Sequence, residues 1–155
     1  MSNLVAQKST HTLKILSTNI AKPGFVTING KTQRTGIHKK PTTQPIYLEK
    51  ENVRGDEVTN RKVHGGIYKA CYLFSADNYP YWKNLYPQLN WEYGMLGENL
   101  TVEGLDETQL HVGDIYKVGD ALIQITQPRE PCTTFAAKMG TLGIMQQFAN
   151  HGKPG

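Results

Sequence analysis

Turn-forming residues interrupt this chain so often that they limit the folds it can adopt. The sequence has 15 glycines and 8 prolines among its 155 residues, and both residue types break the interior of helices and strands. Long helices are therefore not expected, and short strands joined by turns fit better. A chain of this length can bury most of a modest core as one domain, without disulfide bonds or metal ions.

Several short segments are predicted as strands. A first strand covers residues 13–17, and Asn29-Gly30 is a strong hairpin signal between its flanking runs. Alternating apolar residues predict a buried strand at 67–74, with Cys71 inside it. Further strands are expected at residues 99–102, 112–118 and 121–126, the last two joined by a tight turn at Gly119-Asp120.

Three short helices are also predicted. The first runs from a cap near Ser75 to Tyr86, and the spacing of its aromatic residues places them on one face. Such a stripe is more typical of core packing than of a platform for stacking bases. The second begins after Cys132 and ends at Gly140, and the third covers residues 142–149.

The ends of the chain and its two cysteines bear on its location. Residues 1–12 are polar and unpatterned, which predicts a flexible leader before a single domain at 13–155. Because the sequence has no apolar stretch of membrane-span length and no signal-peptide pattern, we expect a cytoplasmic protein without a membrane partner.

A cytosolic chain rarely pairs its cysteines, so Cys71 and Cys132 each need an explanation as packing or as chemistry.

The charge is distributed unevenly. Residues 1–62 contain 11 Lys and Arg against 4 Asp and Glu (11 − 4 = +7), and the remainder contains 6 against 9 (6 − 9 = −3), which together give the net charge of +4. This bias favours nucleic acid, a membrane surface or a phosphorylated ligand, and does not choose among them. An ordinary solvated basic face explains it equally well.

Cys132 is the first candidate for chemistry. It is expected at the N-terminus of a helix, with Arg129 three residues earlier, and both the helix dipole and the guanidinium favour the thiolate. Glu130 opposes that shift, and a small buried residue beside a proline turn is the alternative interpretation. Cys71, inside an apolar strand, is interpreted as an inert core residue.

A second candidate site is the segment from Arg61 to Gly66. The two glycines after His64 allow backbone N–H groups to approach a ligand, and Lys62 beside them suits an anion. A glycine turn, with His64 in a structural hydrogen bond, explains the same pattern. The chain shows no Cys or His pair with zinc-ligand spacing. Lys39 in a basic loop and Asn99 at a strand entry are further polar candidates with equally plain structural explanations.

Taken in order, these segments resemble the MOSC domain family, which is named after the C-terminal domain of molybdenum cofactor sulfurase. The small stand-alone bacterial members are the most similar. The resemblance extends from about Leu13 to Gly155. The motifs that carry it are Thr35-Gly36-Ile37-His38-Lys39, Arg54-Gly55-Asp56-Glu57, Lys62-Val63-His64-Gly65-Gly66, the helix with Tyr79 and Trp82, Met95-Leu96-Gly97-Glu98-Asn99-Leu100, Val112-Gly113-Asp114 and Gln127-Pro128-Arg129-Glu130-Pro131-Cys132.

The resemblance implies a β-rich α+β fold, a MOSC-type β-barrel with a few short helices, whose pocket holds a molybdenum-pterin cofactor. Cys132 would ligate the molybdenum or carry sulfur, which agrees with the softness of a thiolate ligand. Cys132 and His64 would be the catalytic residues, with His64 delivering a proton. Pyridoxal phosphate binding is a further property that the family implies. The candidates for binding the cofactor are Lys39, Lys62, His64, Gly65, Asn99, Arg129 and Cys132.

The resemblance also implies an activity. Similar proteins reduce N-hydroxylated compounds such as hydroxylaminopurines, with electrons from a separate redox protein and with the hard chemistry supplied by the cofactor. The first hypothesis is therefore a molybdenum-dependent oxidoreductase that acts on a small molecule. The second is a non-catalytic carrier of cofactor or sulfur that uses Cys132. An anion- or nucleic-acid-binding module ranks last, because the basic residues are divided among turns.

Members of the family continue beyond the position of Gly155 with another strand. We therefore expect a domain that lacks its C-terminal strand or strands. An open sheet edge would follow, and such an edge is a place where a homodimer can form.

Overall fold

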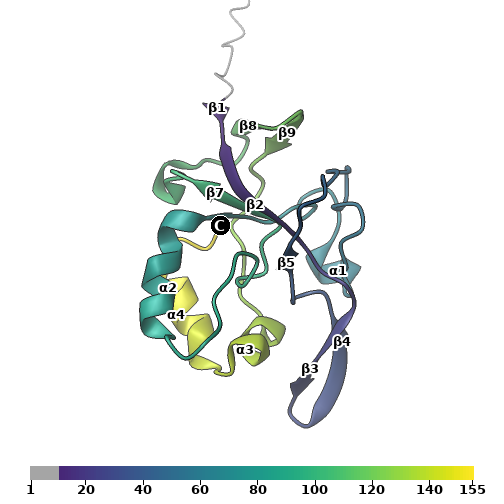
Figure 1. The fold of residues 1–155 in the computed structure, drawn as a ribbon, viewed down its shortest axis with the longest axis vertical. Coiled ribbons are helices and arrows are strands. Elements are labelled where there is room, and N and C mark those ends of the chain that lie inside the picture. Colours follow the sequence, from purple (N-terminus) through teal and green to yellow (C-terminus); the bar gives the residue numbers. More distant parts are fainter. Residues whose placement is uncertain (1–10) are drawn as a thin grey trace, which may run out of the picture.

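A long N-terminal segment connects the two main sheets of the molecule. The computed structural model describes residues 11–155, so the predicted leader lies outside the described residues except for its last two, which form β1 (His11–Thr12). After Leu13, whose N–H donates to the carbonyl of Lys117 at 3.1 Å, the chain continues as β2 (Lys14–Ile20). Figure 1 shows β1 and β2 following one path from the first sheet into the second.

The first sheet has the strand order β1-β8-β9 and the second has the order β5-β2-β7-β6. In the first, β1 is parallel to β8 and β8 is antiparallel to β9; in the second, β2 is antiparallel to β5 and β7, and β6 is parallel to β7. The strands introduced here are β5 (Lys40–Pro41), β6 (Leu73–Ser75), β7 (Leu100–Glu103), β8 (Ile115–Val118) and β9 (Ala121–Gln124).

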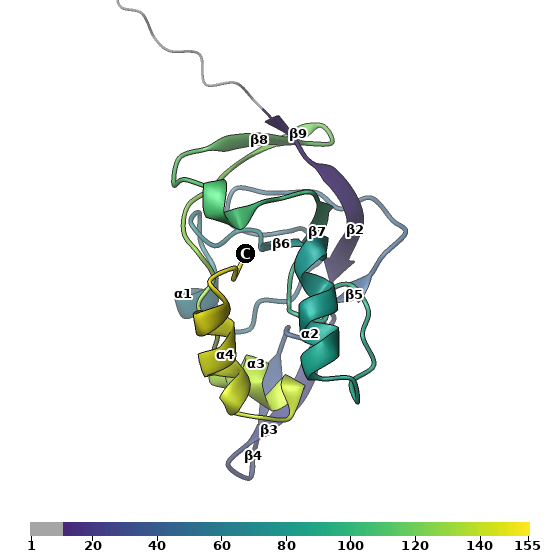
Figure 2. The ribbon, with the colours of Figure 1, turned by 90° about the vertical axis from the view of Figure 1, so that its left-hand side faces the viewer.

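The predicted hairpin at Asn29-Gly30 is confirmed. It consists of β3 (Gly24–Ile28) and β4 (Lys31–Thr35), which pair in regular antiparallel register. Asn29 and Gly30 have φ values of 51° and 74°, the left-handed conformation that a two-residue turn of this type requires. The hairpin projects from the body of the molecule in both ribbon views (Figures 1 and 2).

Three helices gather on one side of the larger sheet in both views. The predicted helix that begins near Ser75 is present as a 3-10 turn followed by α2, and the other two predicted helices are α3 and α4, each ended by a left-handed glycine. A short helix, α1, was not predicted. The helical elements are α1 (Arg61–His64), η1 (Ala76–Asn78), α2 (Tyr79–Leu85), η2 (Glu107–Gln109), α3 (Thr133–Met139) and α4 (Gly143–His151).

An aromatic core joins these helices to β6. Phe74, Trp82, Phe135 and Phe148 are each 0% exposed, and Phe148 lies within ring-contact distance of the other three. The aromatic stripe predicted on α2 is therefore core packing. A second apolar cluster, between the sheets, contains the buried residues Leu73, Leu100, Val102, Leu105 and Val118.

The strand predicted at 67–74 is wrong over most of its length, because only its end belongs to β6. Gly66 has a φ of 89°, and the Lys69 N–H donates to its carbonyl at 3.0 Å, so the chain turns here instead of extending. Ile67 and Tyr68, which produced the apolar alternation, are 45% and 66% exposed. The strands predicted at 112–118 and 121–126 are present but shorter.

The expected α+β fold is confirmed in its coarser form, with several sheets and few helices. The strands described within 11–155 do not close into a barrel. They form three separate open sheets, and apart from β2 each strand has five residues or fewer. Closure needs tilted strands in continuous register around the ring, and here helices fill one side instead. Among these same residues, no helix is long and apolar enough to cross a membrane.

The burial of α4 predicts a difference between two aliphatic residues near its start. Ile144 is 0% exposed and Leu142 is 71% exposed. We expect Ile144→Ala to lower the free energy of unfolding by roughly 2–5 kcal/mol through the cavity it leaves, and Leu142→Ala to change it by less than about 0.5 kcal/mol. Urea unfolding of both variants measures this, and equal losses would contradict the placement of α4.

Candidate functional site

A broad cavity lies beside the larger sheet and collects residues from many parts of the chain. Its volume is about 1240 Å³, and its wall includes the end of the β3–β4 hairpin, α1, β9 and the loop before α3. Most of the residues that the sequence singled out meet here. The predicted site residues in its lining are Lys39, His64, Asn99, Arg129 and Cys132.

Cys132 lies at the N-terminus of α3, as predicted, and is itself the N-cap residue, where Thr133 or Thr134 was expected as the cap. Burial raises the pKa of its thiol, but a hydrogen bond from His64, the backbone N–H of Phe135 and the positive charge of Arg129 outweigh that effect. The pKa falls from 9.0 to about 7. A substantial fraction of Cys132 is therefore thiolate near neutral pH, the form that binds metals and acts as a nucleophile.

Cys71 differs from Cys132 in this respect. It is a free cysteine that packs against the second apolar cluster. Burial raises the pKa of its thiol to about 12. This agrees with its interpretation as an unreactive residue, although it precedes β6 instead of lying within a strand.

His64 reaches Cys132 because a short helix and a close glycine turn place it there. It is the last residue of α1, and Gly65 follows directly. A Cβ atom added to Gly65 would lie 2.8 Å from the carbonyl oxygen of Arg61, so only glycine allows the chain to fold back so tightly. Gly65 thus shapes the backbone that carries His64 and lies outside the cavity lining, as does the exposed Lys62.

Arg129 lies in an aromatic cage behind the cysteine. Its guanidinium carbon is 5.1, 4.5 and 5.4 Å from the ring centroids of Tyr72, Phe135 and Phe148. The Nη1 atom is buried and has no hydrogen-bond partner within residues 11–155. Because a buried donor without a partner is costly, this atom is suited to an anionic group that enters the cavity.

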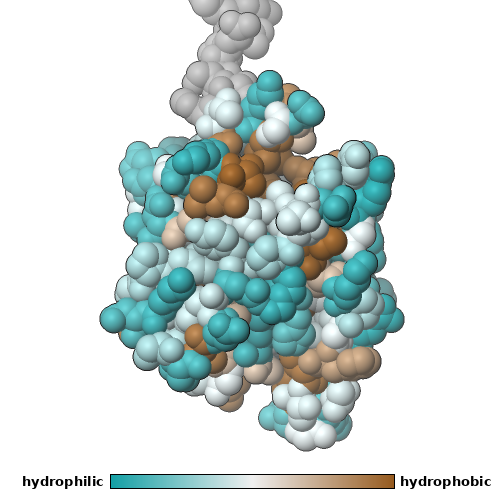
Figure 3. Space-filling model, in the orientation of Figure 1, coloured by the Kyte–Doolittle hydropathy of each residue, from teal (hydrophilic) through white to brown (hydrophobic). Residues whose placement is uncertain are grey.

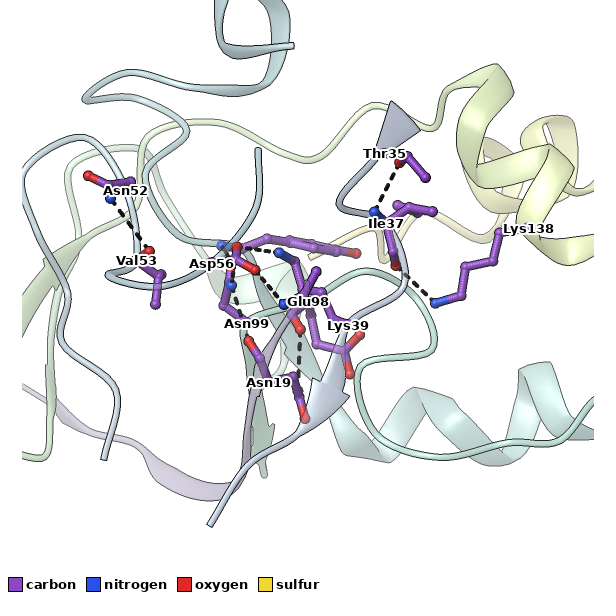
Figure 4. Close-up of polar contacts among 12 residues, drawn as sticks. Asn19, Thr35, Ile37, Lys39, Asn52, Val53, Asp56, Glu98, Asn99 and Lys138 are labelled. Carbon is purple, nitrogen blue, oxygen red and sulfur yellow. Dashed lines mark hydrogen bonds and ion pairs between the residues drawn. The ribbon is translucent and has the colours of Figure 1, made fainter. Parts of the chain in front are cut away.

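A buried ion pair forms part of the cavity floor (Figure 4). Lys39 Nζ pairs with Asp56 Oδ2, and the two side chains are 8% and 2% exposed. Asp56 also accepts hydrogen bonds from the Ala21 N–H at 2.7 Å and from Asn99 Nδ2 at 2.9 Å. Asn99 in turn accepts from the Tyr72 N–H at 3.1 Å. A ligand would therefore meet Lys39 as half of an ion pair, and it would meet Asn99 as a residue whose hydrogen bonds hold the cavity floor together.

The sequence did not identify Asp56 and Lys138 as important residues. Asp56 was quoted only as part of a family motif, and Lys138 had no signal beyond an ordinary lysine in a helix. Lys138 donates to the carbonyls of Ile37 and Gly94 at 3.1 and 3.3 Å, and burial lowers its pKa to about 8. It ties α3 to the loops on either side of the cavity floor.

Glu98 is a second buried carboxylate near this floor and is 0% exposed. Its Oε1 accepts hydrogen bonds from the hydroxyl of Tyr79 and, at 2.8 Å each, from the Gly94 N–H and the hydroxyl of Thr101. Burial, together with the negative charge of Glu98, raises the pKa of Tyr79. Glu98 therefore supports the start of β7 from within the core.

The mouth of the cavity is apolar. Its lining includes five apolar or aromatic side chains, those of Val63, Ile67, Tyr68, Val112 and Leu122. All five are between 45% and 71% exposed. Figure 3 shows a further gathering of apolar surface, on the upper part of the face seen in Figure 1, over the region of β7 to β9. The cavity thus combines a charged floor with an apolar entrance.

Protein side chains alone offer little to hold a metal ion. Among residues 11–155, no group of three or more His, Cys, Asp or Glu side chains has the arrangement of a metal site. A metal at Cys132 would have to bring most of its own ligands.

Comparisons with known proteins point to one family. The family model for the MOSC domain matches residues 60–155. The uncharacterized protein YflK of Bacillus subtilis is 36% identical over 143 residues, which are 91% of this chain and 63% of that protein. A protein of Gibberella moniliformis named "Reductase" is 33% identical over 101 residues, which are 63% of this chain and 18% of that protein.

The fold is similar to a solved structure as well. The crystal structure of YiiM from Geobacillus stearothermophilus matches with a TM-score of 0.70 and 32% identity, over 91% of this chain and 64% of that one. This chain therefore spans less than two thirds of the length of each of these relatives.

The contacts of Cys132 predict how its reactivity depends on pH. We expect its alkylation by iodoacetamide to follow a pKa of about 7, and His64→Ala to raise that pKa because the hydrogen bond to the thiolate is lost. Rates measured between pH 5 and 10 by mass spectrometry of the labelled peptide test this, and Cys71 serves as the slow internal reference. An unchanged pH profile in His64→Ala would contradict the pairing.

The buried ion pair predicts a stability effect. Asp56→Ala leaves Lys39 buried without its partner, which should cost roughly 3–5 kcal/mol of unfolding free energy. Glu103→Ala breaks the exposed pair with Lys14 and should cost less than about 1 kcal/mol. Denaturant unfolding of the two variants compares them, and a small loss in Asp56→Ala would show that the pair does not support the fold.

Proposed function

This chain belongs to the MOSC domain family, and on that premise we propose that its cavity binds a molybdenum-pterin cofactor, with Cys132 as the thiolate that meets the metal. The observation that carries the proposal is the state of Cys132 on the cavity wall, where His64, Arg129 and the start of α3 stabilise the thiolate. A soft thiolate is a suitable ligand for such a metal centre.

Other residues of the cavity also fit the cofactor. The buried Nη1 of Arg129 has no hydrogen-bond partner and can donate to an acceptor. The cofactor has such acceptors in its phosphate and on the polar edges of its pterin. Because the protein supplies one thiolate and no further cluster of ligands within residues 11–155, a metal that arrives with its own dithiolene sulfurs suits the site. Lys39 and Asn99 would face the cofactor from the floor.

The activity that we propose is the reduction of an N-hydroxylated small molecule. When bound, the cofactor supplies the two-electron reduction of the N–O bond, with the electrons coming from a separate redox protein. Two protons are taken up as the bond breaks, and an amine and water are formed. His64, exposed at the cavity wall, is placed to hold and deliver one of these protons. The name of the Gibberella relative supports a reductase in a coarse sense.

One observation favours a second candidate, a carrier that passes cofactor or sulfur to another protein. Cys132 is only half-buried and lines a broad cavity, so a second protein could reach its sulfur. A nucleic-acid-binding module is less supported, because several basic residues of the first half, including Arg34, Lys39 and Arg54, are in ion pairs with carboxylates. Pyridoxal phosphate binding and a homodimer stay predictions.

Metal analysis separates these functions. Protein purified from a host that makes the cofactor should contain molybdenum and pterin, and should convert a hydroxylamine substrate when it is given an electron donor. Cys132→Ala should lose most of the molybdenum and all turnover while remaining folded, and Cys71→Ala should keep both. Folded protein with neither molybdenum nor pterin would contradict the proposal, and a persulfide on Cys132 without turnover would favour the carrier.

A further inference from the structure

The segment 152–155, called the strap below, returns from the end of α4 to the centre of the molecule. Figure 2 shows the chain running back from α4 toward the larger sheet, where it reaches Gly155. Gly152, Pro154 and Gly155 line the same cavity as Cys132. The strap is therefore part of the wall of the candidate site.

Three hydrogen bonds hold the end of the strap, at Pro154 and Gly155. The Gly155 N–H donates to Glu107 Oε2 at 2.6 Å, and the hydroxyl of Tyr72 donates to the carbonyl of Pro154, also at 2.6 Å. On the other side, the Gly155 carbonyl accepts from the Arg129 N–H at 3.0 Å. The strap thus bridges Glu107, on η2, and the backbone of the loop that leads to Cys132.

The fit around Gly155 is too close for any other residue. A Cβ atom added there would lie 2.3 Å from the carbonyl oxygen of Leu73 and 2.5 Å from a ring carbon of Tyr72, and the φ of 89° is left-handed. The position of the strap is therefore set by packing as well as by hydrogen bonds.

Displacing the strap would affect Arg129 in two ways. It would release the Arg129 backbone, and it would free Tyr72, whose ring contacts the guanidinium at 5.1 Å. Arg129 is three residues before Cys132, and its positive charge helps His64 to stabilise the thiolate of that cysteine. A change at the strap would accordingly reach the reactive wall of the cavity.

We propose that Glu107 is a positioning residue: by holding Gly155 it fixes the backbone of Arg129, and with it the part of the wall that carries Cys132. The inference rests on the proposed function only in treating that wall as the cofactor site. Glu107 is well placed for this role, because its other oxygen accepts from Asn78 Nδ2 at 3.0 Å and anchors it to η1.

The test uses the whole 155-residue chain and two measurements. Hydrogen exchange by NMR reports how well the Arg129 N–H is protected, and the half-time of molybdenum loss from loaded protein reports how firmly the cofactor is held. Glu107→Ala should lower the protection of the Arg129 N–H by about tenfold or more and shorten the half-time of molybdenum loss.

The conservative variant Glu107→Gln distinguishes the hydrogen bond from the charge. Its amide oxygen can accept from the Gly155 N–H while the amide of Asn78 turns to accept from its NH₂ group, so most of the protection should return. Glu103→Gln removes the same charge from an exposed position and should leave both measurements unchanged. Gly155→Ala displaces the strap without changing any charge and should reproduce Glu107→Ala, with a double variant no worse than either.

The proposal is overturned if Glu107→Ala leaves the Arg129 N–H fully protected, or if Glu107→Gln is as defective as Glu107→Ala. If Glu107→Ala does not fold, Gly155→Ala decides, and unchanged protection there overturns the proposal equally. Protein that holds no molybdenum in any variant would count against the proposed function alone, because hydrogen exchange does not need the cofactor.

Discussion

The carboxylate of Asp56 holds together the floor on which the candidate site is built. It is almost fully buried and accepts hydrogen bonds from Ala21 directly after β2, from Lys39 before β5 and from Asn99 before β7. A buried carboxylate would be strongly unfavourable alone, and these three donors offset its desolvation. The three donors come from segments far apart in the sequence. The side chain of Asp56 therefore holds the segments next to β2, β5 and β7 together beside the cavity.

The aromatic core both joins two helices and surrounds the guanidinium of Arg129. Phe135 and Phe148 are fully buried and join α3 to α4, and their rings also contact the guanidinium of Arg129. The cation thus sits between the core and the cavity, where a low-dielectric surrounding strengthens its effect on a nearby thiolate. The stability of the helical layer and the chemistry of Cys132 are therefore coupled through shared side chains.

Short-range patterns predicted the local structure well, and long-range arrangement less well. The Asn29-Gly30 hairpin and the helix that starts after Cys132 depend on neighbouring residues, and both are present. The strand at 67–74 was wrong because exposed apolar residues at a cavity mouth produce the same alternation as a buried strand. The barrel expected from the family depends on pairing among distant strands, and the strands within 11–155 form open sheets instead.

By itself the sequence determined the environment of Cys132 along the chain: the helix that follows it and Arg129 before it, since both act within one turn. Only the tertiary structure decided that His64 reaches the sulfur, because their contact depends on α1 and on the close turn at Gly65. It also decided that Lys39 forms an ion pair with Asp56 and that Lys62 lies outside the cavity lining. Electrostatic partners are chosen by distance in space, which neighbouring residues do not specify.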